Sequence, residues 1–351
     1  MLNYFAEKKI DIAASLSEFL KEEENNFSQI NIWAHDVISK ILDFSLQGKM
    51  IRGGLSVLGY EMFSDISNKD IYKIATALEI LQSAFLIHDD IMDRDEQRRG
   101  KDTIYYQYEK SAIMKNYPHP RHYGYSMGIC SGDIAYFLAY AALNRIQTLP
   151  EIKNRIMTIY TNEIIKVGFA QMQDVHFGYI NSCVKLEDII SMYRHKTARY
   201  TFTLPLLLGA EFSGTSENTS DLEKLSELYG IIFQIKDDEL GLFGDEKSIG
   251  KEVGTDIKEG KKTIFYNFVI NAENLPDKER ILGFFGNQNI GENEINEIRN
   301  VVEDCGIRKD INKFVDELAD EAEGFITGLC ISDKHKVILQ EILDYSIKRT
   351  K

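Results

Sequence analysis

The chain has 351 residues, of which 44% are hydrophobic and 27% charged, a composition typical of globular proteins with room for a core and a buried cavity. The formal net charge of −14 excludes nucleic-acid binding through a generally basic surface, so any anionic ligand requires a local cluster of lysines and arginines. With only 5 prolines, long stretches are free to form helices.

The chain shows no sign of a signal peptide or a membrane span. Met1–Phe5 leads directly into the charged residue Glu7 and the lysines after it, which is unlike the apolar centre of a signal peptide. The most apolar runs, residues 136–143 and 204–210, are far shorter than the ~20 residues that cross a bilayer. The sequence therefore predicts a soluble, cytoplasmic protein with no transmembrane segment.

Helical periodicity dominates the chain. Apolar residues recur at spacings of three and four in three clear segments, at residues 74–85, 225–235 and 339–347. Strand-like alternation is scarce, and no loop has the composition of an interdomain linker. We therefore expect an all-α protein with a single domain over residues 1–351.

The first motif in chain order is a basic segment ahead of an apolar helix. Lys49 and Arg52 are three residues apart, so both can point the same way from a helical start. A helix N-terminus adds partial positive charge there, which favours an anion. A solvated helix start is the alternative for this segment taken alone.

An acidic cluster ends the next apolar segment. Asp89 and Asp93 are four residues apart, so on a helix their carboxylates face the same way, roughly 5–6 Å apart. Mg²⁺ takes such oxygens and keeps its other positions for water and phosphate. A solvated acidic helix end is the alternative, but the helix is apolar nearly all round and is therefore expected to be buried.

A basic patch follows this acidic cluster directly. Arg98, Arg99 and Lys101 lie within four positions of one another. An arginine pair alone is usually a surface feature. Beside a predicted Mg²⁺ site, it is typical of side chains that bind phosphate oxygens.

The same arrangement occurs a second time. Asp237 and Asp238 follow the apolar run of residues 228–235, and a glycine-rich stretch with several lysines comes next. Glycines allow the backbone and the lysines to approach phosphate closely. Two buried helices that each end in an aspartate pair indicate a pseudo-symmetric site, in which several Mg²⁺ ions neutralise a diphosphate leaving group.

Taken together, these motifs resemble the trans-isoprenyl diphosphate synthase family, which includes farnesyl and geranylgeranyl diphosphate synthases. The motifs that carry the resemblance are GKMIR (48–52), ILQ (80–82), DDIMD (89–93), RRG (98–100), SGD (131–133), KTA (196–198), FQIKDD (233–238) and GKEVGTDIKEGK (250–261). The resemblance implies an all-α, single-domain helical bundle around a central cavity, the isoprenoid synthase type, in a homodimer. It also implies an enzyme that condenses an allylic diphosphate with isopentenyl diphosphate.

The resemblance assigns a role to each motif residue. Asp89, Asp93 and Asp237 are implied as Mg²⁺ ligands, and Asp90 and Asp238 as their support. Arg98, Lys196, Lys251 and Lys261 are implied to bind the allylic diphosphate, Lys49, Arg52, Gln82 and Arg99 to bind isopentenyl diphosphate, and Thr197 and Gln234 to stabilise the forming carbocation. Two positions depart from the family pattern, since Gly241 stands where a third aspartate is frequent and Gln82 where histidine is frequent.

The resemblance also implies a mechanism and a product length. We expect electrostatic ionisation of the allylic diphosphate, attack by the isopentenyl double bond, and proton loss to the released diphosphate, because His88 faces away from Asp89 and Asp93. Phe85 lies one turn (~5.4 Å) below the metal residues and would form the floor for the growing chain. With the small Ala84 beside it, the resemblance implies geranylgeranyl diphosphate (C20), with farnesyl diphosphate (C15) as the alternative.

Two other classes of protein remain as alternatives. A class I terpene cyclase shares the first acidic motif, but it usually lacks the isopentenyl pocket, and its second site mixes Asn, Ser or Thr with Glu. A non-catalytic subunit of a heteromeric synthase tends to lose one aspartate cluster. This chain keeps both clusters and the Lys49/Arg52 segment, which favours the synthase.

Overall fold

The structure is a computed structural model that describes residues 2–180, 182–215, 219–244, 253–273 and 275–349. The prediction of an all-α protein is confirmed, because the described part holds only two short strands. The helices are α1 (Leu2–Phe27), α2 (Ile32–Leu46), α3 (Ile51–Glu61), α4 (Ile71–Met92), α5 (Ile104–Met114), α6 (Pro120–Asn144), α7 (Pro150–Tyr179), α8 (Leu186–Tyr193), η1 (Arg194–Thr203), α9 (Leu204–Ser213), α10 (Ser220–Phe243), α12 (Thr255–Lys258), α13 (Ile264–Asn271), α14 (Lys278–Leu282), α15 (Glu292–Asp304), α16 (Ile307–Gly328) and α17 (Asp333–Ile347).

The helices group into two compact units. One unit comprises Leu2–Met157 with Pro205–Ser216, and we call it the α4 unit; the other comprises Thr158–Leu204 with Glu217–Lys351, and we call it the α10 unit. The expectation of a single domain over residues 1–351 stays a prediction. Each unit contains a long helix with an aspartate pair. Helix α4 carries its pair in its last turn, whereas α10 continues past Asp238 to Phe243, so the prediction that the second pair ends its helix was wrong.

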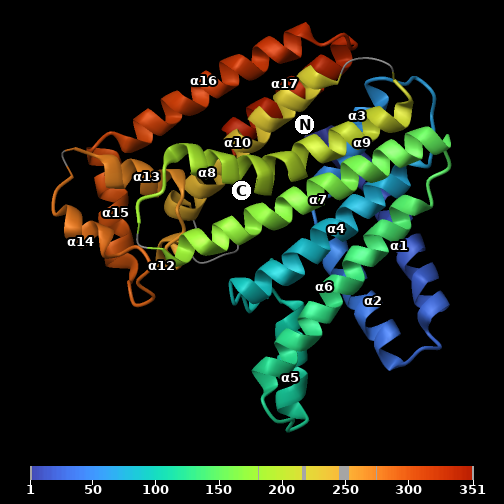
Figure 1. The fold of residues 1–351 in the computed structure, drawn as a ribbon, viewed down its shortest axis with the longest axis horizontal. Coiled ribbons are helices and arrows are strands. Elements are labelled where there is room, and N and C mark those ends of the chain that lie inside the picture. Colours follow the sequence, from blue (N-terminus) through green and yellow to red (C-terminus); the bar gives the residue numbers. More distant parts are fainter. Residues whose placement is uncertain (1, 181, 216–218, 245–252, 274, 350–351) are drawn as a thin grey trace. The chain divides into compact units, whose positions relative to one another are not determined.

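In the α4 unit, α4 packs against α1, α2, α3 and α6 (Figure 1). Its buried residues occupy nearly all sides of the helix, from Ile71 to Asp90, as the apolar composition predicted. Helix α9 crosses α3 at very close range, since a Cβ atom on Gly209 would lie 2.0 Å from the carbonyl oxygen of Ser56. Only glycine permits this approach.

A small hairpin follows α4. Strands β1 (Gln97–Arg98) and β2 (Lys101–Asp102) pair antiparallel, with Arg98 opposite Lys101. The connecting residues Arg99 and Gly100 both have positive φ angles, 53° and 74°, as the tight turns of two-residue hairpins require. The RRG motif is therefore a turn that directs its two arginines differently.

Helix α6 is long and apolar enough, by length and composition alone, to cross a membrane, and it is the one such helix in the described part of the chain. Glycines give it a close fit to its neighbours: a Cβ atom on Gly128 would lie 2.7 Å from Ile91, and one on Gly124 would lie 2.7 Å from the Tyr105 carbonyl oxygen. One side of α6 therefore packs closely against α4 and α5.

In the α10 unit, α10 contacts η1, and it also contacts α16 and α17, which are labelled near it in Figure 1. Segment η1 is a π-helix of ten residues, whereas most π-helical segments are a single turn. It crosses α10 where a Cβ atom on Gly230 would lie 2.1 Å from the Cα atom of Ala198. This close crossing brings the KTA motif against the helix that carries the second aspartate pair.

Candidate active site

The acidic end of α4 has the predicted helical geometry. The amide of Asp93 donates to the carbonyl oxygen of Asp89 at 2.8 Å, so one full turn separates the two residues. Both are half-buried. Their carboxylates therefore come from adjacent turns on the same side of the helix, as a shared cation requires.

Asp90 points elsewhere, into a buried pair with the hairpin. It is 1% exposed, and its Oδ1 atom accepts from Nε of Arg98 at 2.5 Å. Burial raises the pKa of Asp90 to about 7, against the opposing charge of Arg98. Its other oxygen, Oδ2, is buried without a hydrogen-bond partner in the described part of the chain. Asp90 thus fixes Arg98 beside Asp89 and leaves one oxygen for a water or an ion.

A buried glutamate organises the predicted isopentenyl diphosphate residues. Glu79 of α4 is 5% exposed and accepts from the amide of Gly53 at 2.8 Å. A Cβ atom on Gly48 would lie 3.8 Å from both Glu79 and Arg99. Burial raises the pKa of Glu79, while the amide and the charges of Arg52 and Arg99 oppose the rise. The structure therefore brings Arg52 and Arg99 close to Glu79. Our sequence analysis did not identify Glu79.

One premise of the sequence analysis was wrong. Helix α3 begins at Ile51, after Met50 in a left-handed conformation, so Lys49 lies ahead of the helix and shares no helical face with Arg52. Lys49 is exposed, and Gln82 is half-buried on α4. The assignment of both to the isopentenyl diphosphate pocket stays a prediction.

The two residues predicted to set product length lie on different sides of α4. Phe85 is half-buried and meets Tyr136 of α6 edge-to-face, with ring centroids 5.3 Å apart. Ala84 is fully buried. His88 also faces α6, where its Nε2 atom lies 3.1 Å from the Ile129 carbonyl oxygen. The expected orientation of His88 away from the acidic pair agrees with this contact.

In the α10 unit, a chain of hydrogen bonds ends at the second aspartate pair. The Thr197 hydroxyl donates to Oε1 of Gln234 at 2.7 Å, and Nε2 of Gln234 donates to Asp238 at 2.8 Å. Tyr193 donates to the other oxygen of Asp238. Burial and the nearby charge of Asp256 raise the pKa of Asp238 well above its usual range. The two residues predicted to face the carbocation are therefore joined to each other.

Lys196 is held by a buried acid. Its ammonium bonds to Asp174 of α7, which is 9% exposed. Although burial opposes ionisation, the charges of Lys196 and then Lys261 hold the pKa of Asp174 below its usual value. Asp174 sits in an apolar helical run, and an isolated acid there was the available signal for a residue that our sequence analysis missed.

Asp237 is half-exposed and paired with the end of the chain. Its Oδ1 atom lies 2.6 Å from Nη1 of Arg349, whose guanidinium covers the Phe233 ring at 4.0 Å. A cation thus already neutralises the residue predicted to bind the third Mg²⁺. Any metal at Asp237 has to compete with this arginine.

The basic segment after α10 is partly described. Lys251 lies outside the described residues. Lys261 pairs with Glu259 at 2.9 Å and with Asp256 at 3.6 Å. A Cβ atom on Gly241 would lie 3.1 Å from a carboxylate oxygen of Asp256. Asp256 therefore places a carboxylate next to Gly241, the position where the family pattern frequently has a third aspartate.

The carboxylates at the end of α4 fit Mg²⁺ better than a metal ion whose ligands all come from the protein. Among the described residues, no group of three or more His, Cys, Asp or Glu side chains could hold a metal ion. Mg²⁺ is commonly bound by one or two carboxylates, with waters and substrate phosphates completing its shell. The half-buried Asp89 and Asp93, together with the spare oxygen of Asp90, suit that mode.

Comparisons with known proteins identify the family. The polyprenyl synthetase family model matches residues 35–302. This chain belongs to the polyprenyl synthetase family. The predicted family is confirmed, and with it, at the level of the family, the prediction of a trans-prenyltransferase.

Relatives and solved structures agree with the family assignment. A short chain isoprenyl diphosphate synthase of Methanocaldococcus jannaschii is 33% identical over 251 residues, which is 71% of each chain. A geranylgeranyl diphosphate synthase of Sulfolobus acidocaldarius is 29% identical over 78% of this chain and 82% of its own. A geranylgeranyl pyrophosphate synthase of Corynebacterium glutamicum, solved with isoprenyl diphosphate and magnesium, superposes with a TM-score of 0.92 at 26% identity, and the match covers 99% of both chains.

The Asp90–Arg98 pair gives a prediction for this family member. The substitution Arg98→Met leaves a buried carboxylate without its cation, and we expect it to lower the free energy of unfolding by about 3–5 kcal/mol. Urea denaturation measures the change. The double variant Asp90→Asn/Arg98→Met should recover most of the loss, and an Arg98→Met protein as stable as the unmodified one would show that the pair is unimportant.

Proposed function

We propose that this protein condenses an allylic diphosphate with isopentenyl diphosphate and releases an all-trans prenyl diphosphate, with geranylgeranyl diphosphate (C20) as the main product. The observation that carries the proposal is that each unit presents an aspartate pair beside a cationic side chain fixed by a buried acid. Arg98 is fixed by Asp90 in one unit, and Lys196 by Asp174 in the other. The names of the relatives support the same reaction.

Binding of the allylic diphosphate would use the fixed cations. Arg98 and Lys196 offer N–H donors to phosphate oxygens, and Lys261 adds a third positive charge. Because their buried partners hold Arg98 and Lys196 in place, little side-chain entropy is lost on binding. The same residues then stabilise the negative charge that builds up on the leaving diphosphate.

Mg²⁺ would be held by Asp89, Asp93 and Asp237. When bound, it would neutralise the diphosphate and so weaken the bond between carbon and oxygen. Asp90 and Asp238 are buried and would act through waters, since their carboxylates already bond to Arg98 and Gln234. This assignment keeps the five aspartates in the roles that the motifs predicted.

The second substrate would be bound by Lys49, Arg52, Gln82 and Arg99. Glu79 accepts from the amide of Gly53 and attracts two members of this group, Arg52 and Arg99. The Thr197 hydroxyl and the Gln234 amide would present their dipoles to the allylic cation. The released diphosphate takes the proton, because His88 is turned towards α6.

We further propose that the protein forms a homodimer and acts in the cytoplasm. A homodimer is consistent with α6, whose exposed face carries Ile134, Phe137 and Tyr140, exposed by 41%, 77% and 47%. Such apolar side chains favour an interface. A cytoplasmic location is consistent with this enzyme family.

Product analysis tests the proposed reaction. Purified protein with Mg²⁺, radiolabelled isopentenyl diphosphate and C5, C10 or C15 primers should yield mainly C20 diphosphate. Asp89→Asn and Asp237→Asn should each lower kcat by about 100-fold or more, because transition-state charge is no longer neutralised. Asp65→Asn, at an exposed loop position, should leave kcat unchanged.

Two outcomes would contradict the proposed reaction. Hydrocarbon released from farnesyl diphosphate alone would indicate a terpene cyclase. Absence of elongation with every primer would indicate a non-catalytic subunit. A C15 product would retain the reaction and correct only its chain length.

The contact between Phe85 and Tyr136 predicts how product length is limited. Phe85→Ala removes a ring from the path one turn below Asp89, so we expect longer products than those of the unmodified enzyme. Chromatography of the dephosphorylated products measures the change. Phe27→Ala, at a 42% exposed ring on α1, is the matched control, and unchanged products with Phe85→Ala would show that this ring is not the floor.

The contact between Arg349 and Asp237 predicts competition with Mg²⁺. Arg349→Ala frees the Asp237 carboxylate, and because the pair is partly exposed we expect the apparent affinity for Mg²⁺ to rise by about two- to fivefold. Calorimetric titration of Mg²⁺ in the presence of inorganic diphosphate measures this. Weaker Mg²⁺ binding in Arg349→Ala would mean that the arginine assists the ion instead.

A further inference from the structure

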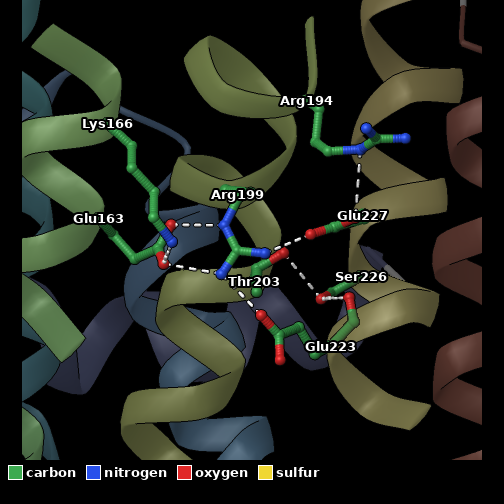
Figure 2. Close-up of polar contacts among 8 residues, drawn as sticks. All are labelled: Glu163, Lys166, Arg194, Arg199, Thr203, Glu223, Ser226 and Glu227. Atoms are coloured by element: carbon green, nitrogen blue, oxygen red, sulfur yellow. Dashed lines mark hydrogen bonds and ion pairs between the residues drawn. The ribbon is translucent and has the colours of Figure 1, made fainter. Parts of the chain in front are cut away.

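Figure 2 shows a cluster of charged side chains centred on Arg199, which is 8% exposed. Its Nε and Nη2 atoms donate to the two oxygens of Glu163 on α7, both at 2.7 Å. Its other contacts are Glu223, at 2.7 Å, and Glu227, both on α10. One guanidinium therefore joins η1 to α7 and α10 through a two-point fork and two further bonds.

The cluster is balanced in charge. Three glutamates meet three bases, and its members are Glu163, Glu223, Glu227, Lys166, Arg194 and Arg199. Replacing buried ion networks with apolar residues is often neutral or stabilising, so stability alone is a weak reason for this one. The best attested role of buried polar groups is to select one register of packing.

Register is the property that η1 most needs to have fixed. A π-helix makes i→i+5 bonds, as in the amide of Leu204 donating to the carbonyl oxygen of Arg199. Such helices are rare, so a ten-residue π-helix has to be held by its surroundings. The Arg199 carbonyl oxygen accepts one of the i→i+5 bonds, and the Arg199 side chain bonds η1 to α7 and α10.

Helices α7 and α10 each contact η1 at two places. On α7 these are Glu163 with Arg199, and Asp174 with Lys196. Asp174 lies eleven residues further along α7, about 16 Å at the rise of a helix. The Arg199 cluster therefore lies at a distance from the site while it holds the same π-helical segment.

Helix α10 likewise contacts η1 at two places. Glu227 contacts Arg199, and Gln234, two turns later, accepts from Thr197. Between the two contacts, Ala198 touches the backbone at Gly230, so η1 has no room to tilt without moving α10. A shift of η1 by one residue would move Lys196 and Thr197 away from Asp174 and Gln234.

We propose that Arg199 is a positioning residue: its fork holds η1 in the π-helical register that places the Lys196 ammonium and the Thr197 hydroxyl against the allylic diphosphate. This inference rests on the proposed function, which assigns Lys196 and Thr197 to that substrate. Arg199 touches no substrate and acts through these two residues.

A kinetic double-variant cycle tests the proposal. Arg199→Lys keeps the charge but loses the planar fork, and it should lower kcat by about 10- to 100-fold, since small misplacements of catalytic groups are costly. The KM for isopentenyl diphosphate, whose predicted binding residues lie in the α4 unit, should stay unchanged. In the Lys196→Ala background, Arg199→Lys should lower kcat by a clearly smaller factor, because only the part of the effect that acts through Thr197 remains and residues that act through one another are not additive.

Two controls separate positioning from general destabilisation. Arg145→Lys alters an arginine that bonds to Glu22 and to the buried Glu23 in the α4 unit, and it should lower Tm with kcat unchanged. If Arg199→Lys does not fold, Arg199→Gln/Glu163→Gln removes both opposed charges and should show the same loss of kcat.

The proposal is overturned by any of three results. These are an unchanged kcat in Arg199→Lys, losses that multiply in the double variant, and an equal loss of kcat in Arg145→Lys. Failure of the proposed function has a different signature, because the unmodified protein then makes no product. In that case, the same variants are titrated with inorganic diphosphate and Mg²⁺ in a calorimeter. If Arg199→Lys changes the Kd by the same factor with and without Lys196→Ala, the inference is overturned.

Discussion

The charges near both aspartate pairs are held by buried partners of opposite sign. Taking an ion out of water is costly unless a partner compensates it, so such pairs fix their members in one geometry. Asp90 holds Arg98 and Asp174 holds Lys196, and farther from the site Glu163 holds Arg199. In a chain of net charge −14, the fixed side chains of Arg98 and Lys196 are what would let an anionic substrate bind.

Each aspartate pair divides its two residues between different tasks. In the first, Asp89 is half-buried and Asp90 is buried against Arg98; in the second, Asp237 is half-exposed and Asp238 is buried against Gln234 and Tyr193. Adjacent helical residues point about 100° apart, so a pair on one helix places one carboxylate outward and one inward. The outward residue is the one proposed to bind an ion, and the inward residue orders the side chains around it.

Local patterns in the sequence predicted the parts of the molecule that depend on local spacing. The apolar periodicity predicted the helices, and the four-residue spacing of Asp89 and Asp93 predicted their shared face. The family motifs identified the family. The helices and the shared face of Asp89 and Asp93 follow from the geometry of a single helix, and neighbouring elements do not alter them.

Features that arise from contacts between distant segments were not predictable in this way. Glu79 and Asp174 look like ordinary acids in their helices until folding brings arginines and a lysine to them. In η1, Arg199 bonds to Glu163 of α7 and Ala198 lies close to Gly230 of α10, and spacing along the chain indicates neither contact. Lys49 was misplaced because the left-handed Met50 delays the start of α3, a backbone detail that residue spacing does not reveal.

We propose that Asp89, Asp93 and Asp237 bind metal ions on the same diphosphate. A crystal structure with Mn²⁺ and inorganic diphosphate, with the ions located by anomalous scattering, tests it most directly. We expect Mn²⁺ bonded to all three aspartates and bridged by one diphosphate. Ions at only one aspartate pair, or two pairs that bind separate diphosphates, would contradict it.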